Sequence, residues 1–285
     1  QSLYNIIDSI YVSYLGTGAL TAVSLAFPLQ NIVLSVAVGI GVGIASVLSI
    51  SLGKKDQKRA NEAATMGMAL TLIHCVLFVI LGLVITEPFI GLFTKEPEVM
   101  KQACDYTYIV LCFSFGSLLQ IAMEKIYQGI GAMKTTMILL GAGAMINIIL
   151  DPILIFGLLG FPEMGVKGAA VATVIGQIVS GIMVILYLRK FKTVDLTLKR
   201  LKPHPHYIGR IVSLGMAPFF NQVSMMVVQI VMNNVLIRYG AKSSYGSDIP
   251  LACAGIITKI NMIFFSINIG ISQGLQPIIS YNYGA

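Results

Sequence analysis

Charged residues are scarce in this chain. Asp, Glu, Lys and Arg make up 11% of its 285 residues and hydrophobic residues 56%, whereas a soluble domain carries about 25% charged residues. This scarcity excludes an ordinary water-soluble domain and predicts an all-α, polytopic helical membrane protein. The net charge of +7 would suggest a nucleic-acid partner in a soluble protein. Here the basic residues fall in the connections between hydrophobic segments, so we expect no nucleic-acid partner.

Cysteine and histidine are few as well. The four cysteines have no metal-ligand spacing, and we interpret them as packing residues: Cys75, Cys104, Cys112 and Cys253. A membrane-embedded enzyme would need a nucleophile with a base, or a metal cluster, at membrane depth. One intramembrane histidine, His74, and scattered acids give that alternative little support. We therefore predict no enzymatic activity, no cofactor and no structural metal.

Eight hydrophobic segments can be marked along the chain. They cover about residues 1–15, 22–52, 63–85, 106–130, 137–161, 168–188, 208–237 and 251–281. Residue 1 is not Met and lies inside a helical pattern, so we expect the chain to begin part-way through a helix, and no cleavable signal peptide is visible. The longest of these segments exceed the thickness of the bilayer core, which predicts tilt, or kinks at Pro28, Pro218 or Pro277.

The loop charges predict an orientation. Twelve basic residues lie in the loops after the second, fourth and sixth segments, and five lie in the opposite loops. The positive-inside rule therefore places the N-terminus and Ala285 in the cytoplasm, with the chain in the inner membrane. The longest polar connection, Arg189 to Arg210, divides six segments from the last two. Either a short amphipathic helix on the membrane surface or a solvated linker fits its composition.

Two segments repeat. The second aligns without gaps on the eighth, so that Gly39, Gly43 and Gly53 match Gly270, Gly274 and Gly284. The first aligns on the seventh in the same way, with Asp8 opposite Gln229. Equivalent segments are six spans apart, so both copies insert in the same direction. Parallel repeats of this kind are one known plan for a transporter.

Asn147 and Asp151 are the most informative polar residues. They lie one turn apart on one helix face, inside an apolar run from Met137 to Phe161. A carboxylate in hydrocarbon costs about 2.5–3.5 kcal/mol on insertion scales, so Asp151 is expected to face the bundle interior and to be functional. Pro152 removes a backbone donor directly after it and loosens the helix. The structural alternative is a carboxylate that only holds two helices together.

Asp8 and Glu124 are the other acids within spans. Asp8 has Tyr4 one turn before it, and it would join Asp151 and Asn147 in an oxygen-rich cluster if the first and fifth segments are neighbours. Such a cluster suits a sodium ion at Asp8 and Asp151, or protons on the same acids. Glu124 is a possible additional polar site. Lys125 follows it directly and would point about 100° away, so we expect a poor ion pair and a lysine that reaches toward the cytoplasm.

Seven stretches resemble the multidrug and toxic compound extrusion (MATE) family of transporters. They are YNIIDSIYVSYLG, LGKKDQKRANEA, YQGIGAMKTT, NIILDPILIFG, GVKGAAVATVIGQ, GMAPFFNQV and GISQGLQPIISYNYGA, in the family's order. The resemblance implies two six-helix lobes related by a pseudo-two-fold axis. This chain would hold the first lobe, with helix one incomplete, and helices seven and eight. The implied domains are an N-terminal lobe over 1–190, a cytoplasmic linker over 191–207, and the start of a second, pseudo-symmetric bundle over 208–285.

The resemblance also implies a function and a site. Family members export organic cations and other amphipathic drugs in exchange for protons or sodium, by alternating access. Their first-lobe cation site corresponds to Asp8, Asn147 and Asp151, with Tyr4 and Thr173 at neighbouring polar positions. The expected partners are small amphipathic or cationic substrates and membrane lipid, and the complete protein is expected to be a monomer. The alternative is a related flippase for lipid-linked precursors, which a basic central cavity would favour.

Overall fold

The computed structural model describes residues 2–188, 193–194, 205–240, 242–243 and 248–285. Within these ranges, the side chains of residues 2–6, 188, 237, 248, 249, 251, 252, 256, 259 and 262 are outside the description. Every regular element among the described residues is a helix, which confirms the all-α prediction. The helices are α1 (Ser2–Ser13), α2 (Thr17–Gly53), α3 (Gln57–Gly91), α4 (Pro97–Cys112), α5 (Phe115–Gly129), α6 (Met133–Phe156), α7 (Val166–Leu188), α8 (Pro205–Gly240) and α9 (Asp248–Gly284), with a short 3₁₀ turn η1 at Leu158–Gly160.

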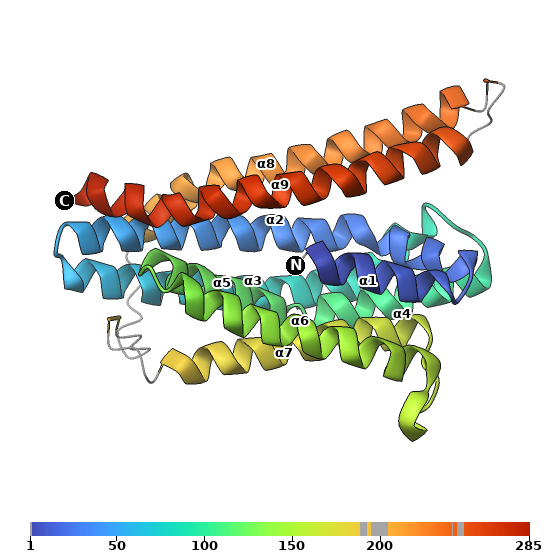
Figure 1. Ribbon diagram of the computed structural model, residues 1–285, viewed down its shortest axis with the longest axis horizontal. Coiled ribbons are helices and arrows are strands. Elements are labelled where there is room, and N and C mark those ends of the chain that lie inside the picture. Colours follow the sequence, from blue (N-terminus) through green and yellow to red (C-terminus); the bar gives the residue numbers. More distant parts are fainter. Residues whose placement is uncertain (1, 189–192, 195–204, 241, 244–247) are drawn as a thin grey trace.

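Helices α1 to α7 form one bundle, and α8 and α9 run side by side along α2 (Figure 1). The pair lies close to α2 at the end that carries the turn between α2 and α3. It diverges from the bundle toward the other end (Figure 1). The last residue, Ala285, lies at the same end as the α2–α3 turn, as the predicted orientation requires of two cytoplasmic segments. The predicted linker, 191–207, lies mostly outside the described residues.

Local sequence signals set several helix ends. The Asp56 side chain accepts a hydrogen bond from the Arg59 backbone N–H at 3.0 Å and so caps α3. Pro97 opens α4, where a missing N–H costs nothing. Gly157 ends α6 in the left-handed conformation, with φ of 71°. A side chain on residue 157 would also meet the backbone of Glu163, so this turn requires glycine.

The fourth hydrophobic segment, predicted over 106–130, is divided into two helices that meet at a bend. Helix α4 ends at Cys112, α5 begins at Phe115, and their axes differ by 43°. Helices α2, α8 and α9 continue through Pro28, Pro218 and Pro277, the positions at which kinks were predicted. One cysteine also departs from the packing interpretation: Cys75 and Cys104 are buried, whereas Cys253 is exposed.

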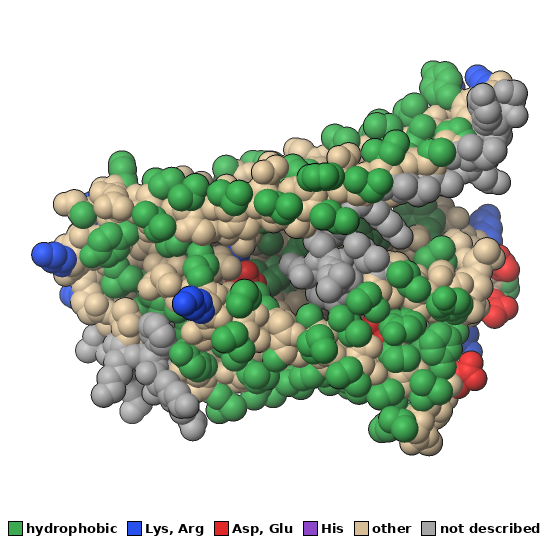
Figure 2. Space-filling view, viewed as in Figure 1, with side chains coloured by type: hydrophobic (Ala, Val, Ile, Leu, Met, Phe, Trp, Pro, Cys, Tyr) green, Lys and Arg blue, Asp and Glu red, His purple; other side chains and the backbone are tan. Residues whose placement is uncertain are grey.

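The composition of the helices fits a membrane protein. Five described helices are long and apolar enough to cross a membrane, and the bent pair α4–α5 makes a sixth if it is one span. Hydrophobic side chains cover most of the visible surface between the two ends of the molecule, where Lys, Arg, Asp and Glu side chains gather (Figure 2). Such a surface would be unstable in water and is stable against lipid.

The predicted repeat has a structural counterpart in α2 and α9. Each helix has 37 residues, and the alignment that pairs Gly53 with Gly284 also pairs their first residues, Thr17 and Asp248. The two helices pack against each other near their C-terminal ends. Equal length in the predicted register supports the interpretation of the two helices as copies of one element.

Candidate functional site

Asp151 and Asn147 lie inside the bundle, on the face of α6 that meets α7. Asp151 has no exposed surface and Asn147 is 3% exposed. The Asn147 amide Nδ2 donates hydrogen bonds to Asp151 Oδ1 at 3.1 Å and to Thr173 Oγ1 of α7 at 3.4 Å. The one-turn spacing read from the sequence thus produces a real contact, and Thr173 lies where the family resemblance implied.

Asp8 approaches the same region from α1. Helix α1 packs against α6, which confirms the expected neighbourhood of the first and fifth hydrophobic segments. The Asp8 and Asp151 carboxyl groups are close enough to interact electrostatically. Tyr4 belongs to α1, but its side chain is outside the described residues. Asp151 is fully buried, whereas Asp8 is partly exposed and has its Oδ1 atom buried.

Three buried oxygen atoms at this site have no hydrogen-bond donor among the described residues. They are Asp8 Oδ1, Asn147 Oδ1 and Asp151 Oδ2. A buried acceptor without a donor is unfavourable by about 1–3 kcal/mol, and more if it is charged. A proton on a carboxyl group, or a small cation with oxygen ligands, would satisfy these atoms. The arrangement is therefore suited to reversible binding of a proton or a small cation.

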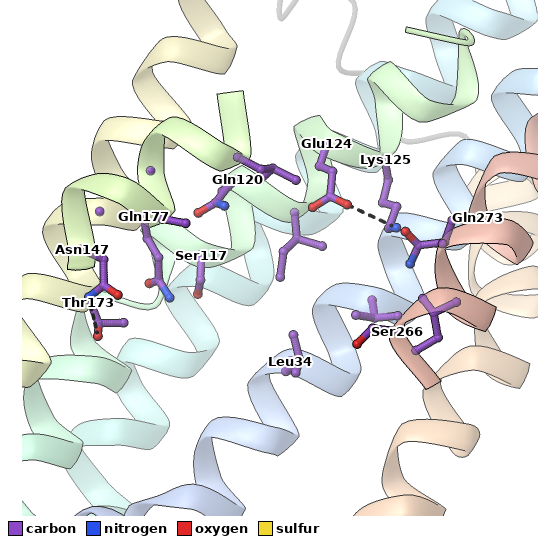
Figure 3. Close-up of a pocket in the computed structure, with 18 residues that line it drawn as sticks. Leu34, Ser117, Gln120, Glu124, Lys125, Asn147, Thr173, Gln177, Ser266 and Gln273 are labelled. Atoms are coloured by element: carbon purple, nitrogen blue, oxygen red, sulfur yellow. Dashed lines mark hydrogen bonds and ion pairs between the residues drawn. The ribbon is translucent and has the colours of Figure 1, made fainter. Parts of the chain in front are cut away.

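A cavity lies between the seven-helix bundle and the α8–α9 pair (Figures 2 and 3). Two adjoining chambers of about 360 and 770 Å³ share several lining residues, so they form one space. Its wall carries many amide side chains, among them Gln120, Gln177 and Gln273. The larger chamber continues along α2 and α9 past Asn31 and Asn261. Sequence reasoning missed these amides because single Asn and Gln residues in apolar helices show no spacing pattern.

The cavity reaches the buried acids only at their edge. Asn147 and Thr173 line the smaller chamber, whereas Asp8 and Asp151 do not line either chamber (Figure 3). A ligand in this conformation would therefore meet the amide of Asn147 before it met the carboxyl groups. Direct competition between a drug and the ion for the same acids has no support in this geometry.

Glu124 and Lys125 form an ion pair in the cavity wall, contrary to prediction. Lys125 Nζ lies 3.5 Å from Glu124 Oε1, and the lysine is 2% exposed rather than extended toward the cytoplasm. Gln128 explains the difference, since it lies three residues after Lys125 and four after Glu124. It accepts a hydrogen bond from Lys125 Nζ at 2.8 Å and donates one to Glu124 Oε1 at 2.7 Å. The i, i+3 and i, i+4 spacings could have revealed this bridge.

The charge of the cavity bears on the flippase alternative. Among the described residues that line the two chambers, Glu124 is the only acid and Lys125 the only base. Their charges compensate each other, so this part of the wall has no net positive charge. Lys259 of α9, a second lysine within a hydrophobic segment, has its side chain outside the description.

The family assignment rests on residues 1–153, more than half of the chain, which match the MatE family model. The chain belongs to the MatE family. It is 28% identical over 283 residues to the multidrug export protein MepA of Staphylococcus haemolyticus, covering 99% of this chain and 60% of that protein. It is 26% identical over 290 residues to a FAD transporter of Shewanella oneidensis, covering 99% of this chain and 61% of that protein.

Solved structures of MatE family proteins have the same fold. A crystal structure described as a MATE P26A mutant matches with a TM-score of 0.91 and 28% sequence identity, over 100% of this chain and 62% of that one. The chain spans about 60% of the length of the relatives it matches. The chain therefore corresponds to a multi-pass portion of a transporter of this family, as the resemblance implied.

Proposed function

We propose that this chain carries the ion-coupling lobe of a secondary active transporter in the inner membrane, with its N-terminus in the cytoplasm. The complete protein would export organic cations and other amphipathic drugs in exchange for protons or sodium. The observation that supports this most directly is the set of three buried oxygen atoms that have no donor among the described side chains, on Asp8, Asn147 and Asp151. Such atoms are unfavourable in an apolar bundle, and an ion that occupied the site during part of a transport cycle would satisfy them.

Coupling would pass through Asn147. Its amide bonds Asp151 on one side and faces the cavity on the other. When an ion neutralises the carboxyl groups, the hydrogen bond from Asn147 to Asp151 weakens and the amide becomes free to reorient. A ligand bound beside Asn147 would then lose or gain a partner, although it never touches Asp151.

Alternating access is supported by the uneven contact of α2 with α8 and α9. Near the end of α2 that carries Gly53, glycines bring the three backbones into direct contact. Toward the other end the α8–α9 pair diverges from the bundle (Figure 1). The cavity thus lies beyond a closed seam, and opening that seam would expose it to the opposite side. We propose residues 1–190 as the first lobe, 208–285 as the start of the second, and a monomer as the working unit.

The experiment is transport of a fluorescent organic cation by the complete gene product in proteoliposomes. Either a proton gradient or a sodium gradient is imposed, with the other ion held equal on both sides. We expect uphill movement of the dye under one of the two gradients and none without a gradient. Equal movement in vesicles with and without the protein, under both gradients, would contradict the proposal.

A further inference from the structure

A lysine is buried in the wall of the cavity, beside a glycine that makes room for it. Lys125 extends from α5 over Gly41 of α2, and it is 2% exposed. A Cβ atom on residue 41 would lie 2.6 Å from the Lys125 Cγ atom, so any larger residue would displace the lysine. Because a buried ammonium group is unfavourable in a membrane span unless it is paired, this placement calls for a specific reason.

Hydrogen bonds to Gln128 fix the positions of Lys125 and Glu124 relative to each other. Gln128 accepts from the ammonium group at 2.8 Å and donates to Glu124 Oε1 at 2.7 Å, which fixes both charges relative to each other. The Glu124 side chain is 15% exposed and the Lys125 side chain 3%. Both residues line the smaller chamber, where the Glu124 side chain is the more exposed of the two, and Gln273 of α9 lies beside Lys125 (Figure 3).

This pair determines the charge that a ligand meets. No other charged residue lines the two chambers within the described part of the chain. A monocation that approaches Glu124 is attracted by the carboxylate and repelled by the ammonium group, whose Nζ atom lies 3.5 Å from Glu124 Oε1. A ligand with one positive and one negative group can place its cation near the Glu124 carboxylate and its anion near the Lys125 ammonium group. A low local dielectric strengthens both attractions. The surrounding amides of Gln120 and Gln177 can bond groups of either polarity.

We propose that Lys125 sets the ligand charge preference of the cavity, so that it takes zwitterionic ligands at least as well as monocations. This inference rests on the proposed export function and narrows its substrate class to amphipathic compounds that carry an ammonium or similar cation together with a carboxylate or similar anion. Lys125 acts as a positioning residue, because it holds and compensates Glu124.

The test uses two dyes with one ring system. Rhodamine 110 has a free carboxylate and is zwitterionic, whereas rhodamine 123 is its methyl ester and a monocation. Binding of each dye to the purified complete gene product is measured by fluorescence polarisation, which does not require transport. In the wild type we expect the free acid to bind at least as tightly as the ester.

Two single variants should shift the preference in opposite directions. Lys125→Met leaves Glu124 uncompensated and should raise the affinity ratio of ester to free acid about tenfold, equivalent to about 1.4 kcal/mol. Glu124→Gln leaves Lys125 uncompensated and should lower that ratio about tenfold. Lys125→Arg should keep the wild-type ratio, and the double variant Glu124→Gln/Lys125→Met should return near it. A merely structural role for the lysine would weaken both dyes equally and leave the ratio unchanged.

The outcomes separate the inference from the function on which it rests. A wild type that binds the ester about tenfold more tightly than the free acid, or does not bind the free acid, overturns the inference. An unchanged ratio in Glu124→Gln overturns it even if Lys125→Met fails to fold. Failure of the export function is a different result, namely that neither dye moves under either ion gradient while the binding ratios still shift.

Discussion

Gly53 of α2 and Gly284 of α9 lie at equivalent places in one helix contact. Gly53 meets the backbone of Tyr281, and Gly284 meets the backbone of Ile50. The alignment that pairs Gly53 with Gly284 also pairs Ile50 with Tyr281. The glycine of each helix therefore contacts the equivalent residue of the other helix. Such reciprocity is what a two-fold relation between repeats produces. The contact joins the first bundle to the α8–α9 pair at the end where the cavity is closed.

A methyl group at Gly53 should loosen this contact. Gly53→Ala places a Cβ atom against the Tyr281 carbonyl group, and overpacking of this kind costs about 1–3 kcal/mol. We expect a lower thermal unfolding midpoint in detergent. Gly274→Ala on α9 is the matched control, because a Cβ atom there has no neighbour within 4 Å. Equal midpoints for the two variants would show that the close contact does not contribute to stability.

A second prediction concerns the packing of α5 on α7. The Tyr127 hydroxyl group donates to the Val184 carbonyl oxygen at 2.9 Å, and Tyr127 is fully buried. Tyr127→Phe leaves that carbonyl without this donor and should cost about 1 kcal/mol. The control is Tyr14→Phe, since Tyr14 is 74% exposed. We expect a lower midpoint in thermal unfolding for the first variant alone. No difference between the variants would mean that water or another donor replaces the hydroxyl group.

The amide of Asn147 should matter more than the hydroxyl group of Thr173. Asn147→Ala removes the donor to Asp151 Oδ1, whereas Thr173→Val removes only the acceptor at 3.4 Å. We expect the ion concentration for half-maximal transport to change about tenfold in the first variant and less than about threefold in the second. The measurement is dye transport over a range of concentrations of the coupling ion. A larger change in Thr173→Val than in Asn147→Ala would mean that Thr173, and not Asn147, couples the cavity to the ion site.

The sequence was sufficient to predict most of the fold. Hydrophobic length predicted the spans, and the alignment of the second segment on the eighth predicted two helices whose bounds agree at both ends. The break between Cys112 and Phe115 was not predictable, because no proline marks it and the apolar run continues through it. Whether Pro28, Pro218 and Pro277 kink their helices stays a prediction.

The candidate site was predictable in part. The spacing of Asn147 and Asp151 is local, so it could be read directly from the helical repeat. The position of Lys125 could not, because its burial depends on Gly41 of a different helix. The amides of the cavity come from α2, α5, α6, α7, α8 and α9, and only the tertiary structure brings them together. The roles of all six site residues stay predictions: Asp8, Asn147, Asp151, Tyr4, Thr173 and Glu124.

Asp8 should behave like Asp151, and Glu124 should not. Asp8→Asn keeps the shape of the side chain and removes the charge of a carboxyl group whose buried Oδ1 atom has no donor within the described part of the chain. We expect ion-driven transport to be abolished while the protein still folds. Glu124→Gln should give a milder loss, because Glu124 lies in the cavity wall and has Lys125 and Gln128 as partners. The measurement is the initial rate of dye transport under the coupling gradient. A greater loss in Glu124→Gln than in Asp8→Asn would move the coupling site to the cavity wall.

The most direct test is the ion movement that accompanies transport. Proteoliposomes with the complete gene product receive dye on one side, and the resulting flux of protons or of radioactive sodium is recorded for the wild type and Asp151→Asn. A loss or gain of one charge at this depth changes the energy of the site by several kcal/mol, and about 5.5 kcal/mol is enough to move a two-state equilibrium from 1:99 to 99:1. We predict dye-dependent flux of one of the two ions in the wild type and none in Asp151→Asn, with both proteins still binding dye. Equal dye-dependent ion flux in the two proteins would contradict the account.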